Sequence, residues 1–166
     1  LVREAGADKP VWSWVPEQTA GSWARRMLHE TAVHRGDIEL ALGRTPEYDP
    51  AVAVDGVDEF LTVLPSAAAF SPRIRALTGD GETLHLHATD DGLGPSGEWT
   101  VTSDEVDGIT WSHDHGKGDV ALRGSAKDLL LAIVRRRTSA DGGIEVFGGT
   151  AVWYRWLEPS SFLLGG

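Results

Sequence analysis

The first sustained hydrophobic pattern in the chain has the spacing of an amphipathic helix. It runs from Thr19 to Gly43 and carries Trp23, Met27 and Leu28 on its apolar side. Threonine is a common capping residue before the first helical turn, and glycine is common just after the last one. The pattern therefore predicts a helix between these two residues.

A second helical pattern follows and leads into a linker. Asp49 and Pro50 provide a capping side chain and a first-turn proline for the segment AVAVDGVDEFLTVL, which we expect to end at Pro65. The two predicted helices would lie antiparallel. Residues 66 to 73, SAAAFSPR, form a linker rich in small residues, after which the pattern changes to alternation. We therefore place a domain boundary at this linker.

The second half of the chain alternates apolar and polar residues in short segments, which is typical of β-strands. Clusters of Gly, Asp and Pro separate these segments, as in an antiparallel meander. A helix over residues 126 to 137, with Ser125 as its capping residue, has a broad apolar stripe and should cover one face of the sheet. GIEVFGG adds a strand and TAVWYRWL a final helix, so the predicted fold class is α+β. The four predicted meander strands are residues 83 to 90, 98 to 104, 108 to 113 and 119 to 124.

Composition and charge restrict the classes of function. With 166 residues, 41% of them apolar and 24% charged, the chain can form one or two compact domains. The net charge of -10, with no basic run beyond Arg135, Arg136 and Arg137, argues against nucleic acid as a partner. Apolar stretches such as DLLLAIV are far shorter than the roughly 20 residues of a membrane span. We expect a soluble, cytoplasmic protein that binds neither nucleic acid nor membrane.

The absence of cysteine restricts the chemistry further. It excludes disulfides, thiolate nucleophiles and cysteine-ligated metals, and it leaves histidine and the carboxylates as the good metal ligands. Any thiol chemistry must therefore use a thiol that another molecule supplies.

The segment MLHETAVHRGD, residues 27 to 37, contains the most informative polar pattern. Each helical residue advances about 100°, so His34 lies at roughly +40° and Asp37 at roughly -20° when Glu30 is taken as zero. These three side chains share one face. The step from His29 to His34 is about 140°, which is too wide for the paired histidines of the H-E-x-x-H zinc proteases. A zinc-protease site is therefore excluded.

Glu30 and His34 can both reach one divalent metal ion, with one oxygen and one nitrogen ligand. A catalytic zinc site takes three protein ligands and keeps an open position, so a third ligand is required. The alternative is a hydrogen bond between Glu30 and His34 on a solvated helix face. The spacing alone leaves both interpretations open.

Longer stretches of the sequence carry a family resemblance. WARRMLHETAVHRGDIELALG, followed by DPAVAVDGVDEFL, resembles the metal-binding helical domain of the mycothiol-dependent maleylpyruvate isomerase family, a DinB-like four-helix bundle. LHLHATD, GEWTV, GDVALRGSAKDLLL and IEVFGG resemble that family's C-terminal domain, whose architecture is similar to that of sterol-carrier proteins. The resemblance implies that residues 1 to 66 are the C-terminal part of the helical domain, a remaining helix pair. Residues 74 to 166 would be the C-terminal α+β domain, an antiparallel sheet with packed helices.

The resemblance also implies a metal site and a reaction. Zinc would be held by Glu30, His34 and a histidine on an early bundle helix that would precede Leu1, so a further segment or another chain would complete the bundle. Mycothiol or another low-molecular-weight thiol would be the second cofactor. In the isomerase the thiol adds to a cis double bond, the bond rotates, and the thiol leaves to give the trans isomer. The metal would act as a Lewis acid that stabilises the thiolate.

The family's reaction further implies an arginine in the C-terminal domain that faces the cleft between the two domains. Its planar guanidinium would hold the carboxylate of a small acidic substrate through two parallel hydrogen bonds. The position in LLLAIVRRR favours Arg136, and Arg123 at the end of a strand is the second choice. The alternative for Arg136 is a basic last helical turn, stabilised by the helix dipole.

Four further histidines lie in the predicted sheet region. His85 and His87 share one face of a strand, and His113 and His115 flank Asp114 in a predicted turn. A second metal site and simple hydrogen bonding across the sheet are both compatible with this pattern, and hydrogen bonding is the commoner arrangement.

Two functions from different classes remain open. The first is a metal-dependent enzyme of the thiol-adduct type, an isomerase or a transferase, that acts on a small acidic substrate. The second is a non-catalytic family member that binds a small ligand or a protein partner. Glu30 and His34 favour the enzyme.

Overall fold

The computed structural model describes residue 4 and residues 6–75, 80–104 and 108–160 of the chain. The chain divides into two compact units, Leu1–Glu47 and Tyr48–Gly166. The second predicted helix therefore belongs to the same unit as the sheet, whereas we had placed the boundary after that helix, at residues 66 to 73. Each unit is described by itself.

The first unit contains one long helix, α2 (Ala20–Ala41). Its predicted cap is confirmed, because the Thr19 hydroxyl accepts a hydrogen bond from the backbone N–H of Ser22, and the Ser22 hydroxyl accepts one from the backbone N–H of Thr19. On its expected apolar side, Met27 and Leu28 remain 48% and 52% exposed.

The second unit begins with α3 (Pro50–Ala67), whose N-terminus is capped by the Asp49 carboxylate as predicted. Pro65 does not end this helix, which was the expectation. Pro65 lies within the last turn, where the loss of one backbone donor removes only a terminal hydrogen bond, and the N–H of Ala68 still donates to the Pro65 carbonyl. A short helix, α4 (Pro72–Arg75), follows.

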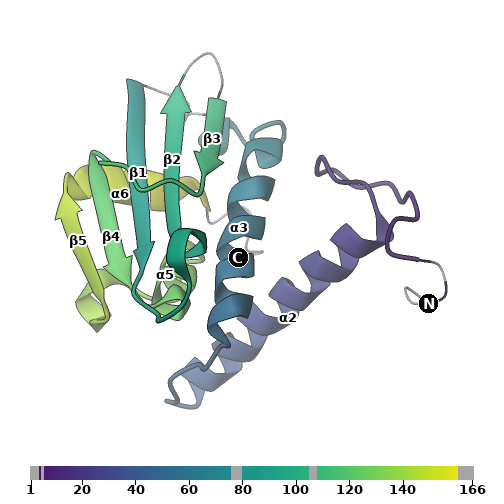
Figure 1. Cartoon of the computed structure of the whole chain (residues 1–166), viewed down its shortest axis with the longest axis horizontal. Coiled ribbons are helices and arrows are strands. Elements are labelled where there is room, and N and C mark those ends of the chain that lie inside the picture. The colour runs from purple at the N-terminus through teal and green to yellow at the C-terminus, as the bar shows by residue number, and fades with distance from the viewer. Residues whose placement is uncertain (1–3, 5, 76–79, 105–107, 161–166) are drawn as a thin grey trace. The chain divides into compact units, whose positions relative to one another are not determined.

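One sheet holds all four predicted strands and the strand expected from GIEVFGG, in the order β3-β2-β1-β4-β5 (Figure 1). The first three strands form the predicted antiparallel meander. The fourth strand does not extend it, because β4 pairs with β1 in parallel on the other side, which corrects the expectation of an antiparallel sheet. The strands are β1 (Asp80–Ala88), β2 (Glu98–Asp104), β3 (Gly108–Ser112), β4 (Val120–Gly124) and β5 (Ile144–Gly148).

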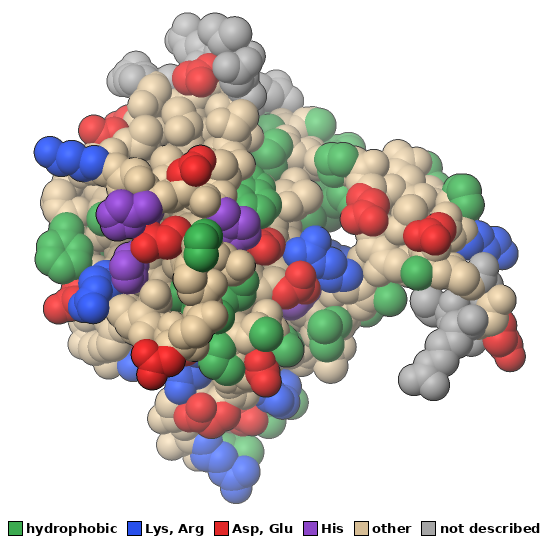
Figure 2. All heavy atoms as spheres, in the orientation of Figure 1, with side chains coloured by type: hydrophobic (Ala, Val, Ile, Leu, Met, Phe, Trp, Pro, Cys, Tyr) green, Lys and Arg blue, Asp and Glu red, His purple; other side chains and the backbone are tan. Residues whose placement is uncertain are grey.

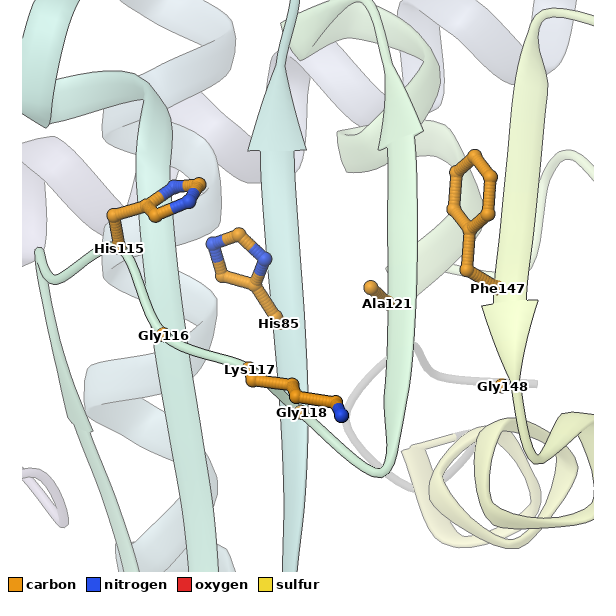
Figure 3. Close-up of a pocket in the computed structure, with 8 residues that line it drawn as sticks. All are labelled: His85, His115, Gly116, Lys117, Gly118, Ala121, Phe147 and Gly148. Atoms are coloured by element: carbon orange, nitrogen blue, oxygen red, sulfur yellow. The ribbon is translucent and has the colours of Figure 1, made fainter.

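The mixed order forces the connection between β3 and β4 to cross the sheet. Residues 113–119, here called the crossing segment, leave the edge strand β3 and pass over β2 and β1 before they enter β4 (Figures 1 and 3). Two glycines allow this segment to lie close to the sheet. A Cβ at Gly116 would be 2.8 Å from the Thr100 hydroxyl, and one at Gly118 would be 2.6 Å from the Val120 carbonyl oxygen.

The opposite face of the sheet forms the core. Helix α5 (Ala126–Ile133), which begins at the predicted Ser125 cap, packs on β1 and β4 and contacts α3, so the expected helical cover is confirmed. It ends four residues before the predicted Arg137, because Arg135 has a φ of +60° and leaves the helical region. The predicted final helix is α6 (Thr150–Ser160). Side chains of the sheet that are fully buried on this face include Leu84, Leu86, Trp99, Val101, Val120 and Leu122.

No helix among the described residues is both long enough and apolar enough to pass through a membrane.

The close approach of the crossing segment to the sheet predicts the effect of a single methyl group. Gly118→Ala should lower the free energy of unfolding by about 1–3 kcal/mol, because the new Cβ would meet three backbone atoms, including the His85 nitrogen at 2.9 Å, and none of these can rotate away. Urea unfolding followed by tryptophan fluorescence would measure the change.

Gly149→Ala is the matched control, since its Cβ would have its nearest contact at an ordinary 3.5 Å. Its free energy of unfolding should change by no more than about 0.5 kcal/mol. Equal effects of the two substitutions would contradict the close packing of the crossing segment.

Candidate functional site

One face of α2 brings together the side chains that the sequence singled out. Nε2 of His34 lies 3.5 Å from Oε2 of Glu30, and Nδ1 of the same ring lies 3.1 Å from Oδ2 of Asp37. The other Glu30 oxygen is engaged by Arg26. His29 is buried, whereas the His34 side chain is 58% exposed. The predicted common face of Glu30, His34 and Asp37 is therefore confirmed, and His29 lies in a different environment.

Which ring nitrogen of His34 contacts which carboxylate matters for metal binding. When the Asp37 carboxylate accepts the proton on Nδ1 of His34, the imidazole is oriented and the lone pair of Nε2 is available beside Glu30. A histidine held in this way by a carboxylate is the usual arrangement behind a metal ligand. Glu30 and His34 can thus offer two donor atoms to a metal ion, Oε2 and Nε2, while Asp37 orients the imidazole. A catalytic zinc site needs a third protein ligand in addition.

The candidate arginines occupy different settings in the second unit. Arg136 lies just beyond the end of α5, and its Nη1 donates a 2.8 Å hydrogen bond to the Val134 carbonyl. Arg123 on β4 forms a 2.9 Å ion pair with Glu145 on β5. A substrate-binding role for Arg136 stays a prediction.

A second cluster lies on the face of the sheet opposite the core. Three imidazoles converge on the Glu98 carboxylate: Nε2 of His85 at 2.7 Å, Nδ1 of His87 at 2.8 Å and Nδ1 of His115 at 3.2 Å. Figure 2 shows histidine and acidic side chains gathered over the sheet, and Figure 3 shows the rings of His85 and His115 next to each other. We call these four residues the histidine cluster.

Strand register explains how three of these residues meet. His87 is directly opposite Glu98 in the antiparallel pair of β1 and β2, and His85 is two residues away on the same face of β1. His115 comes from the crossing segment. The sequence indicated a shared face for His85 and His87, but Glu98 was missed, because only the pairing of β1 with β2 identifies it as their neighbour.

The crossing segment is fixed to the sheet at both ends. At β2, the Thr100 hydroxyl donates to the Asp114 carbonyl, and Nδ1 of His113 contacts the Glu98 carbonyl at 2.8 Å. At β1, the Asp119 carboxylate accepts hydrogen bonds from the backbone N–H and the hydroxyl of Thr83. These Thr83 hydrogen bonds hold the pKa of Asp119 below its ordinary value of 3.8. His115 is therefore held above the sheet between two anchored points.

Two hollows adjoin the cluster. One, of about 500 Å³, is lined by His85, His115, Lys117 and Phe147 among others (Figure 3). The other, of about 670 Å³, includes His87, Glu98 and Arg123 in its wall, and His115 borders both hollows. Small molecules can thus reach the cluster from two sides.

Comparison with known proteins gives matches to two family models. A model described as the MDMPI C-terminal domain matches residues 51–155, and one described as the mycothiol maleylpyruvate isomerase N-terminal domain matches residues 1–39. A search of curated proteins found no match.

The chain is similar to several solved structures. One is a UbiJ-SCP2 ubiquinone synthesis protein, with 19% identity, a TM-score of 0.49, and coverage of 68% of this chain and 96% of that one. Another is the sterol carrier protein domain 2 of Helicoverpa armigera, with 16% identity, a TM-score of 0.45, and coverage of 67% and 90%.

The anchor at Asp119 predicts a change in local dynamics. Asp119→Ala should speed amide hydrogen exchange at Thr83 and along the crossing segment, because the carboxylate that accepts from Thr83 is lost. Asp141→Ala is the matched control, since Asp141 accepts the same pair of hydrogen bonds from Thr138 at a turn outside the crossing segment. Exchange by NMR that is unchanged in Asp119→Ala would contradict the anchor.

Acid should weaken the same anchor in the unsubstituted protein. The pKa of Asp119 is lower in the folded state than its ordinary value of 3.8, so its stabilising effect is complete above that pH and is lost as the pH falls through the lowered value. The Thr83 amide resonance should therefore hold its position from neutral pH down to about 4 and shift only below it.

Proposed function

The chain belongs to the mycothiol maleylpyruvate isomerase family. We propose that it acts as a metal-dependent isomerase or transferase that works through a thiol adduct of its substrate. The substrate is a small acid, the metal is zinc, and the thiol is mycothiol or another low-molecular-weight thiol. One observation carries this proposal: on α2, Asp37 orients the His34 imidazole so that Nε2 faces Glu30.

The residues of α2 have distinct tasks in this proposal. Glu30 and His34 hold the metal, which supplies Lewis acidity that stabilises the thiolate of the cofactor. Asp37 keeps the proton of the imidazole on Nδ1, so that Nε2 stays a ligand. Arg26 binds the Glu30 oxygen that does not face His34, which restricts rotation of the carboxylate.

The exposed apolar side chains of α2 support a further helix as the source of the third ligand. Met27 and Ile38 lie within about 20° of each other around the helix, and His34 is about 20° from Met27. Both apolar residues are about half exposed or more. A segment or second chain that covers this stripe would approach the Glu30 and His34 face directly, as the family's bundle requires.

Arg136 is proposed to hold the substrate carboxylate. Its hydrogen bond to Val134 fixes one edge of the guanidinium at the end of α5. The planar donor group suits a carboxylate better than the point charge of a lysine.

The metal-binding part of the proposal can be tested in the natural protein with maleylpyruvate and mycothiol. Glu30→Gln and His34→Ala should each reduce turnover at least about 100-fold, because a lost ligand removes the electrostatic stabilisation that the metal provides. Asp37→Asn should lower zinc affinity by about 10-fold to 100-fold, measured by competition with a chelator.

Glu39→Gln is the control for these substitutions, since Glu39 is an acidic residue of the same helix that pairs with Arg35 instead. Its turnover and zinc affinity should match those of the unsubstituted protein. Unchanged turnover in both Glu30→Gln and His34→Ala would overturn the proposal and favour a non-catalytic binding function.

Arg136 gives a separate prediction. Arg136→Ala should reduce turnover of maleylpyruvate at least about 100-fold, as two charge-assisted hydrogen bonds to the carboxylate are lost. Arg136→Lys should recover little of it. Arg135→Ala, at the adjacent exposed position, should keep full turnover. Circular dichroism and zinc content should be the same for all three variants, and full turnover in Arg136→Ala would contradict the role.

A further inference from the structure

We propose that His85, Glu98 and His115 form a second divalent-metal site, on the open face of the sheet and separate from the residues of α2. One donor atom from each of these three side chains lies within 4.8 Å of the other two. All three belong to the second unit, so the site is complete without α2. Two imidazoles and one carboxylate are the donor set of several catalytic zinc sites, and they also suit cobalt and nickel.

The spacing of the donors is close to that of a loaded site. Bonds from zinc to imidazole nitrogen or carboxylate oxygen are roughly 2.0–2.2 Å long, so the donors of a tetrahedral site lie about 3.3–3.6 Å apart. A spacing of up to 4.8 Å therefore requires side-chain rotations that bring the donors closer by up to about 1 Å. The ring centroids of His85 and His115 are 5.2 Å apart and their planes are nearly perpendicular, at 89°.

The number of imidazoles exceeds what a structural role for Glu98 would need. His87 is the residue directly opposite Glu98 in the pairing of β1 and β2, and its contact with Glu98 already gives that carboxylate a cross-strand partner. His85 and His115 add two further ring nitrogens at the same carboxylate, from a second strand position and from the crossing segment. Ring nitrogens that share one carboxylate through their protons can share one metal ion through their lone pairs.

The three ligands differ in how far they are buried. The side chain of His85 is only 7% exposed and that of Glu98 15%, whereas that of His115 is 76% exposed. The two inner ligands are thus fixed by the sheet, and the outer ligand is carried by an anchored segment. The hollows beside them leave room for water or a small ligand at the open coordination positions.

The surrounding charges indicate what the open positions would take. Lys117 lines one hollow and Arg123 lines the other. Cationic side chains beside a bound metal ion favour a small anion as the further ligand. We assign His87 as a positioning residue, because its Nδ1 contacts Oε1 of Glu98 and orients the carboxylate.

The test uses a Glu30→Gln/His34→Ala background, so that any metal bound by α2 does not contribute. Titration with Co²⁺ and Zn²⁺, followed by calorimetry and by the visible absorption of Co²⁺, should give one equivalent of bound metal. Adding Glu98→Gln or His115→Ala should weaken the binding at least about tenfold and remove the absorption. Adding His87→Ala should weaken it less than either, since a positioning residue is lost and not a ligand.

Glu145→Gln is the matched control, because Glu145 is also a carboxylate on this face of the sheet but pairs with Arg123. It should leave the affinity unchanged. His115→Ala removes a highly exposed side chain and should not affect folding, which circular dichroism would verify. Equal affinities in His115→Ala, Glu145→Gln and the background protein would overturn the proposal, as would the absence of any bound metal in the background protein.

Discussion

The parallel pairing of β4 with β1 is the constraint on which the open face of the sheet depends. β3 lies at one edge, and β4 lies beyond β1 and runs in the same direction as β1, so the chain between them has to cross two strands. A connection of seven residues can do this only close to the sheet surface. Gly116 and Gly118 provide that closeness, and Asp119 fixes the segment where it arrives at β1.

The same crossing brings a residue of another segment to a row of ordinary strand positions. Without it, His85 and His87 would be solvent-facing residues opposite Thr100 and Glu98. With it, His85 is 5% exposed and a third imidazole is placed at the Glu98 carboxylate. The course of the backbone thus determines which side chains meet at the Glu98 carboxylate.

The crossing segment also connects the open face to the core. His113 contacts the Glu98 carbonyl through Nδ1, and its Nε2 lies 3.3 Å from the Asp58 carboxylate on α3. The same carboxylate accepts a 2.6 Å hydrogen bond from the indole N–H of Trp99, which is fully buried. A buried indole without an acceptor would cost about 1–3 kcal/mol. Asp58 therefore stabilises the core and helps to hold the start of the crossing segment.

Local patterns were sufficient to predict the elements, and long-range pairing was not. The caps at Thr19, Asp49 and Ser125 identified three helix starts, because a capping side chain acts on the neighbouring backbone. The common face of Glu30 and His34 followed from helical geometry alone. By contrast, no local signal determines which strand β4 pairs with, so the contact of Glu98 with His115 could not be predicted.

Helix ends were less predictable than helix starts. Pro65 was expected to stop α3, but a proline in the last turn removes a single hydrogen bond and the buried apolar side of the helix continues to Ala67. α5 ends at Ile133, although the apolar and basic pattern continues to Arg137. The reason is the left-handed backbone conformation of Arg135, which the pattern of apolar and polar side chains does not predict.

The two donor sets differ in how they depend on folding. Glu30 and His34 are four residues apart on one helix, so their spacing exists wherever α2 is helical. His85, Glu98 and His115 come from two strands and a crossing segment, so their spacing exists only when the sheet is formed. Metal binding at such a set stabilises the folded unit by mass action. The geometry of the first set thus depends on one helix, whereas the geometry of the second depends on the folded sheet.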